Sequence, residues 1–261
     1  MDTRVNPVRE RLERVREVLA RRQAHAIVVP SSDPHLSEYL PDRWAGREWL
    51  SGFTGSMGTL VVARERAALF ADSRYWEQAA QQIAGSGIEL VKIPTGASMH
   101  PIDWLVAHTP AGGVVMVDGQ VLGLATARQM RDAFEKAGIT LRTDQDLLAE
   151  VWSGRPGLPS GSVYAHEMPQ VCRPRAARLA AVREAMTRQR ASHHLVSSVD
   201  DIAWITALRG ADVEYNPVFI AHLLIEPTRA TLFVGAGKIG PELAAALAAD
   251  GVAIADYGAA G

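Results

Sequence analysis

Two segments in the first half of the chain carry side chains that could hold a substrate. In FADSRYW, Arg74 stands where a strand should give way to a helix. A guanidinium fixed at such a junction could receive a carboxylate through two hydrogen bonds. The segment SSDPHLSEY follows another expected strand, and the ends of strands in α/β proteins are where ligand crevices form. Its candidate side chains are Asp33, His35, Glu38 and Tyr39.

A third segment, LRGADVEYNPVF at 208–219, places Asp212, Tyr215 and Asn216 in a loop that Pro217 restricts. All three segments also fit a purely structural role as turns, helix caps and surface. Residue types alone assemble no complete catalytic group here. The residues by themselves therefore favour a binding or covering module over an enzyme.

Metal and nucleotide motifs are absent from the sequence. Its eight histidines are scattered, and the adjacent pair His193 and His194 would point to opposite faces of a strand. The segment GFTGSMG has glycines at 52, 55 and 58, a spacing that fits neither a dinucleotide-binding loop nor a P-loop. We therefore predict no metal ligand in this chain, and a structural turn before a strand at 57–63.

The composition and charge of the chain limit the classes of protein to which it can belong. Of the 261 residues, 48% are hydrophobic and 21% charged, and the net charge is −2. Such a chain can form a core, and no basic patch attracts nucleic acid or an anionic membrane. The N-terminus is too charged for a signal peptide and no apolar run is long enough to span a bilayer. A single cysteine, Cys172, fits a reducing compartment, so we expect a cytoplasmic protein without nucleic-acid or membrane partners.

Helical and strand patterns alternate along the chain. Val8, Leu12, Val15, Val18 and Leu19 have helical spacing, and HAIVVP follows as a buried strand. GTLVVARERAALFAD indicates two strands joined by a charged hairpin turn, followed by a helix for which Ser73 is a possible N-cap. Continued alternation predicts an α/β fold with a mixed sheet.

The pattern of helix followed by strand repeats in the second half of the chain, and matching residues of the two copies keep a constant difference in residue number. RLERVREVLARRQAHAIVVPSSD ends at Asp33, and RLAAVREAMTRQRASHHLVSSVD ends at Asp200. This internal duplication predicts two domains, at 1–152 and 173–261, joined by a Gly/Pro/Ser-rich linker at 153–172. In the second copy we expect helices at 173–190 and 238–249 and strands at 193–197, 217–226, 229–234 and 251–256. The second copy is shorter than the first, so we expect the natural chain to continue.

Four segments in this order carry a family resemblance: IVVPSSDPHLSEY, REWLSGFTGSMGTLVV, ALFADSRYWEQA and VDDIAWITALRGADVEYNPVF. They resemble the N-terminal half of cytosolic aminopeptidase P, the long three-domain Xaa-Pro aminopeptidases of the creatinase/prolidase-like metallopeptidases. One departure is Met57, where the family usually has alanine. The resemblance implies two tandem creatinase N-terminal-like domains, each a mixed β-sheet flanked by helices. It also implies a downstream pita-bread domain that holds two metal ions, usually Mn²⁺, on ligands that do not occur in this segment.

The activity implied is release of an N-terminal residue when proline comes second. The chain would then be inactive alone and would cover the substrate site of its own C-terminal catalytic domain, restricting it to short peptides. Family members often form dimers, so the resemblance also implies a homodimer. Arg74 matches the family arginine that contacts substrate. Further candidates for substrate binding are His35, Asp212, Tyr215 and Asn216. The alternative is a stand-alone creatinase-like module that binds peptides or another subunit without catalysis.

Overall fold

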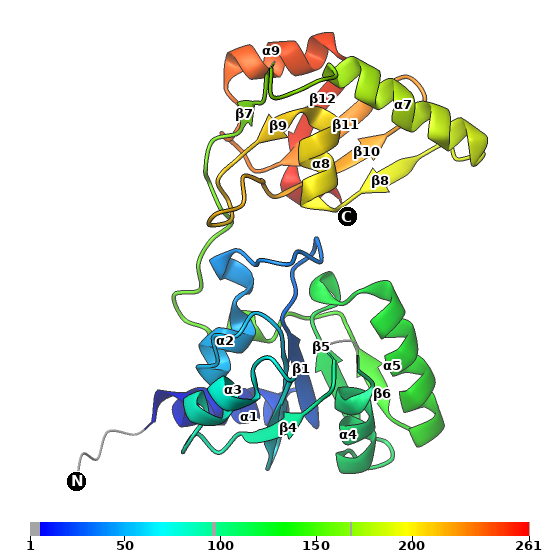
Figure 1. Cartoon of the computed structure of the whole chain (residues 1–261). Helices are drawn as coiled ribbons and strands as arrows, with labels where there is room; N and C mark the ends of the chain where they lie inside the picture. The colour runs from blue at the N-terminus through cyan, green and yellow to red at the C-terminus, as the bar shows by residue number, and fades with distance from the viewer. Residues whose placement is uncertain (1–5, 96–97, 168, 261) are drawn as a thin grey trace. The chain divides into compact units, whose positions relative to one another are not determined.

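A computed structural model describes residues 6–95, 98–167 and 169–260 (Figure 1). The chain divides into two compact units, Met1–Pro156 and Gly157–Gly261. Most of the predicted linker at 153–172 therefore belongs to the second unit. Within it, strand β7 (Tyr164–Ala165) pairs with β9 (Leu208–Arg209), and the amide of Val163 donates to the carbonyl of Lys238 at 2.8 Å. Backbone hydrogen bonds order a segment that has no apolar period in its sequence.

The first unit is built on a six-stranded sheet in the order β4-β3-β2-β1-β5-β6. Strands β1, β2 and β3 pair antiparallel, and the β3–β4, β1–β5 and β5–β6 pairs are parallel. The mixed sheet and the charged hairpin between β2 and β3 are as predicted. The bounds are β1 Ala26–Pro30, β2 Thr59–Ala63, β3 Ala67–Ala71, β4 Glu89–Lys92, β5 Val114–Val117 and β6 Thr140–Arg142.

Helices cover both faces of this sheet (Figure 1). One face packs against α1 (Pro7–Arg21), α2 (Gly46–Ser51), α3 (Trp76–Gln82) and α6 (Leu148–Val151), and the other against α4 (His100–His108) and α5 (Leu124–Ala137). Helix α1 begins after Asn6, whose Oδ1 accepts a hydrogen bond from the amide of Val8 at 2.9 Å. Its five apolar residues with helical spacing are all buried, as predicted.

The order of strands reverses between β1 and β5. From β1 the chain moves to β2, β3 and β4 on one side, then returns through α4 to β5 on the other side of β1. The connection that leaves β1 passes through α2 on one face of the sheet, whereas α5, which follows β5, lies on the other face. Such a reversal opens a crevice at the carboxyl ends of the two strands.

The second unit has a four-stranded sheet in the order β12-β11-β10-β8. Its pairings repeat those of β4-β3-β2-β1: two antiparallel pairs and one parallel pair at the β11–β12 end. Leu195 pairs with Leu224 as Val28 pairs with Val61, so the duplication holds at the level of register. The elements are α7 Arg175–Arg188, β8 His194–Val196, α8 Val199–Thr206, β10 Ala221–Ile225, β11 Ala230–Val234, α9 Pro241–Ala249 and β12 Val252–Asp256.

Two local predictions were wrong. The strand expected at 217–226 begins only at Ala221, because the carbonyls of Pro217 and Val218 accept hydrogen bonds from the amides of Gly210 and Asp212 instead of a sheet neighbour. Ser73 does not cap α3, which begins at Trp76. Instead, the carboxylate of Asp72 accepts a hydrogen bond from the backbone amide of Arg74 at 3.1 Å, just before the helix.

Candidate functional site

One edge of the first sheet gathers the polar segments of this unit. Strands β1 and β3 end there and β2 begins there, since Thr59 pairs with both Pro30 and Phe70. SSDPHLSEY leaves β1, GFTGS leads into β2, and DSRYW leaves β3. The topology therefore brings His35 and Arg74 to the same edge from separate parts of the sequence.

Arg74 is held in a fixed direction yet remains accessible. Its Nε and Nη2 donate to the Oδ1 and Oδ2 of Asp72 at 3.1 and 2.8 Å, and its guanidinium lies 5.2 Å from the centre of the Tyr75 ring. The side chain of Arg74 is 62% exposed, whereas that of Asp72 is 6% exposed. An arginine has five N–H donors, so the pair leaves further donors for an anionic ligand such as a carboxylate.

The ion pair also changes the acidity of Asp72. Hydrogen bonds from Arg74 hold the pKa of the Asp72 carboxyl below its usual value, and burial acts in the opposite direction. Because this pKa is lowered in the folded protein, the pair stabilises the fold above the ordinary carboxyl pKa and the benefit disappears as the pH falls through the lowered value.

We expect Arg74→Ala to raise the pKa of Asp72, because burial would then act on the carboxylate without an opposing charge. A carboxyl ¹³C NMR titration measures this directly. Asp144, whose pKa is lowered by Arg142, serves as an internal control and should titrate unchanged. An unmoved Asp72 signal would show that the pair does not set its ionisation.

His35 lies inside the first unit and is 5% exposed. The buried carboxylate of Asp33 shapes the turn around it, with Oδ1 accepting from the amides of His35 and Ser37 at 2.9 and 3.0 Å. The turn places Leu36 at a φ of +54° with 64% of its surface exposed. A direct substrate contact by His35 stays a prediction, and the buried position of this residue fits a role in shaping the turn.

Arg47 organises the GFTGS segment, and its importance was not predicted. It is 5% exposed, and it donates to Ser31 Oγ at 2.7 Å, to the Phe53 carbonyl at 2.6 Å and to the Gly55 carbonyl. Burial lowers the pKa of Arg47 to about 10, so the residue is still charged at neutral pH. In the sequence Arg47 is followed directly by a second charged residue, Glu48, so nothing in the segment that becomes α2 distinguishes it.

The glycines and hydroxyls of this segment have structural contacts. Gly52 ends α2 with a φ of +74°, a conformation that favours glycine. Ser56 Oγ lies 2.7 Å from the Tyr75 hydroxyl, and Thr54 Oγ1 accepts from Gln78 at 2.9 Å. These bonds tie the segment to α3 and its N-terminal turn beside Arg74.

In the second unit, the loop that follows β9 is anchored by a buried ion pair. Oδ2 of Asp212 accepts hydrogen bonds from Lys238 Nζ and from the amide of Ile220, the latter at 2.7 Å. The side chains of Asp212 and Lys238 are 0% and 2% exposed. The carboxylate of Asp212 is thus engaged within the fold. Lys238 was not predicted, since 26 residues separate it from Asp212.

The other two predicted residues of this loop are more open. Tyr215 is 96% exposed and has a φ of +60°, while Asn216 is half-buried and forms a bridge with Val213. A tyrosine at such a φ is uncommon outside constrained turns. The buried ion pair anchors the loop at Asp212, and the bridge between Val213 and Asn216 encloses the turn from which Tyr215 projects into solvent.

Among the described residues, no group of three or more His, Cys, Asp or Glu side chains is placed to hold a metal ion. The described helices also include none long and apolar enough to cross a membrane. The His, Cys, Asp and Glu side chains of the described residues therefore do not form a donor set that fits a dinuclear metal centre.

Comparison with known proteins places these two units in a family. The creatinase/prolidase N-terminal domain family matches residues 11–149, and a second family with the same description matches residues 154–261. The chain belongs to the creatinase/prolidase N-terminal domain family. The two matches fall one in each unit, so both copies of the duplication are domains of this kind.

Relatives align along nearly the full chain. A probable Xaa-Pro aminopeptidase P of Talaromyces marneffei is 36% identical over 243 residues, covering 92% of this chain and 37% of the relative. A probable Xaa-Pro aminopeptidase P of Podospora anserina is 35% identical over 254 residues, covering 95% of this chain and 37% of the relative. This chain thus spans little more than a third of the length of these proteins.

A solved structure is also similar to this chain. The X-prolyl aminopeptidase of Caenorhabditis elegans, described as a cytosolic enzyme with a di-nuclear active site, matches with a TM-score of 0.90 and 26% identity. The match covers 96% of this chain and 42% of that enzyme.

Proposed function

We propose that this chain is the non-catalytic, substrate-covering part of a Xaa-Pro aminopeptidase. The observation that carries the proposal is the match of both units, in tandem, to proteins named Xaa-Pro aminopeptidase P, at 36% identity over 243 residues. The two units would shape the substrate site of a dinuclear metal domain in the remainder of the protein. The full-length protein would be a cytoplasmic metallopeptidase, and a homodimer.

The substrates would be short peptides with proline in the second position. Proline has no amide hydrogen and restricts the conformation of the residue before it. Peptidases that bind an extended backbone through its amide groups therefore cleave the bond before proline poorly. An enzyme for it needs other contacts to fix the peptide. Arg74 supplies one in our proposal: it points its remaining donors at the carboxylate of a short peptide while Asp72 fixes its direction.

The loop at 212–216 would supply contacts from the second unit. Tyr215 and Asn216 would meet the substrate or the catalytic domain, and Asp212 would hold the loop through Lys238. His35 would help to shape the edge on which Arg74 lies.

The metal ions, for which we propose Mn²⁺, would be bound by the remainder of the protein. The described residues hold no fitting donor set, so no catalytic step is assigned to them. The 261-residue chain should accordingly show no peptidase activity of its own when Mn²⁺ is added.

In the full-length protein we expect Arg74→Ala to lower kcat/KM on a tripeptide by roughly ten- to a hundredfold, the scale of a lost charged hydrogen bond. Arg74→Lys should restore part of the loss, because an ammonium keeps the charge but loses the fork geometry. Arg142→Ala, which removes another aspartate-paired arginine at the end of β6, is the matched control. Equal kcat/KM values for the Arg74→Ala and parent enzymes would remove Arg74 from the substrate site.

A further inference from the structure

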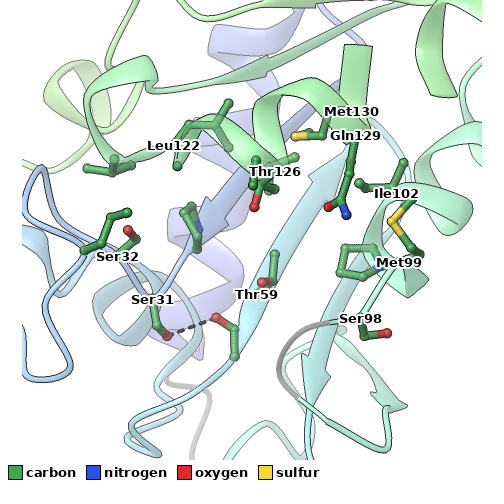
Figure 2. Close-up of a pocket in the computed structure, with 18 of the residues that line it drawn as sticks. Ser31, Ser32, Thr59, Ser98, Met99, Ile102, Leu122, Thr126, Gln129 and Met130 are labelled. Carbon is green, nitrogen blue, oxygen red and sulfur yellow. Dashed lines mark hydrogen bonds between the residues drawn. The ribbon is translucent and has the colours of Figure 1, made fainter. Parts of the chain in front are cut away.

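A pocket of about 550 Å³ opens in the first unit at the carboxyl end of β1 (Figure 2). It lies between the first turns of α4 and α5, where the order of strands reverses between β1 and β5. Small-molecule sites typically have this size, and in open α/β sheets they lie at such reversals. None of the roles proposed above for Arg74 or for the 212–216 loop uses this pocket.

The lining is apolar with a few neutral polar groups. Figure 2 shows Thr126 and Gln129 reaching into the pocket from α5, with Thr59 of β2 across from them. Apolar walls come from Ile102, Leu122 and Met130. The described residues that line the pocket include no charged side chain, so an ionised ligand would lose its hydration without finding an opposite charge.

The rim of the pocket exposes apolar surface that a ligand would cover. Leu36, Met57, Met99 and Leu124 come from four separate segments and are 64%, 38%, 39% and 61% exposed. An exposed apolar patch around a concave site is typical of a binding surface.

Leu36 lies over this rim in a strained conformation. Its φ of +54° is unfavourable for a leucine, and it is imposed by the turn that Asp33 closes. A Cβ placed on Gly123 would be 3.5 Å from Leu36 Cδ1, so the leucine reaches the residue that precedes α5. Strain retained at the mouth of a pocket points to a function for the side chain that it positions.

We propose that this pocket binds a small uncharged molecule with an apolar body and a hydrogen-bonding group. Thr59, Thr126 and Gln129 would bond its polar group, and Leu36 would close over its apolar part. The inference is independent of the proposed peptidase function, since the pocket is lined neither by Arg74 nor by the 212–216 loop.

Methyl NMR of the 261-residue chain tests the proposal. The methionine methyls of Met57, Met99 and Met130 lie at the pocket, whereas Met116 and Met186 are buried elsewhere and report that the chain is folded. The probes are phenol, cyclohexanol, N-acetyl-leucine methylamide and N-acetyl-phenylalanine methylamide, with N-acetyl-phenylalanine as the charged counterpart. We expect at least one uncharged probe to shift the pocket methyls saturably, and the charged acid to bind about tenfold more weakly or worse.

Variants locate the binding. Thr126→Trp should fill the pocket and weaken the bound probe about tenfold, while Arg128→Trp on the same helix, outside the pocket, should leave the affinity nearly unchanged. Leu36→Gly removes the closing side chain and relieves its strain, so the probe should bind more weakly to a chain that is no less stable. If none of the uncharged probes shifts the pocket methyls, or if Thr126→Trp and Arg128→Trp behave alike, the proposal is wrong.

Discussion

Replacing Lys238 with methionine should destabilise the second unit by about 3–5 kcal/mol, because it leaves a buried carboxylate without its counter-charge. Asp212 has no exposed side-chain surface, and its Oδ1 finds no hydrogen-bond partner among the described residues. Its Oδ2 depends on Lys238 and on the amide of Ile220. Loss of the lysine should therefore loosen the whole loop that presents Tyr215.

Hydrogen exchange, followed by mass spectrometry along a urea titration, measures the stability of each unit separately. Separate values are needed because a chain of two units need not unfold in one step. The double variant Asp212→Asn/Lys238→Met should regain part of the stability, since it removes both charges together. Arg229→Ala breaks the exposed pair with Glu226 and should change little. A second unit as stable in Lys238→Met as in the parent chain would contradict the assigned role of the ion pair.

The second large effect is expected at Arg47. Arg47→Met should destabilise the first unit by about 2–4 kcal/mol, because three acceptors, two of them buried, lose their donor. They are Ser31 Oγ and the carbonyls of Phe53 and Gly55. Removing the buried charge offsets part of this cost, as the lowered pKa of Arg47 indicates.

The same hydrogen-exchange measurement should show the loss in residues 43–62 and in the first turn of α3, which this loop contacts through Ser56 and Tyr75. Arg47→Lys should recover only part of the stability, because an ammonium cannot serve three acceptors with the fixed geometry of a guanidinium. Arg128→Met, at an exposed position of α5, is the control. Equal unfolding free energies for Arg47→Met and Arg128→Met would show that Arg47 does not hold the loop.

Periodicity in the sequence was sufficient for the strands of the two larger sheets, apart from the start of β10, and for the duplication. The five apolar residues of α1 and the strand pair β2–β3 follow from local patterns, and the offset between the two copies reappears in the paired residues of both sheets. Local pattern could not show that 157–172 joins the second unit, because its order comes from bonds to distant backbone such as that of Lys238.

The candidate site was predicted less completely for the same reason. Arg74 was chosen from its strand-to-helix junction and from the family resemblance. Its contact with substrate stays a prediction, and the structure adds Asp72 as the group that orients it. Arg47 donates hydrogen bonds to backbone carbonyls, and Lys238 donates to a carboxylate 26 residues away along the chain. No local spacing in the sequence therefore indicates either residue. His35 was chosen as a polar residue just past a strand end and Asp212 as a polar residue of a loop restricted by Pro217, and both are buried.

The most direct test of the proposed function compares the protein encoded by the complete reading frame with the 261-residue chain, on a tripeptide with proline second and with Mn²⁺ added. The account predicts that the complete protein releases the N-terminal residue and that the shorter chain does not. Hydrolysis by the shorter chain alone would contradict the assignment of catalysis to the rest of the protein. A complete protein that binds such peptides without cleaving them would show instead that the two units form a binding module.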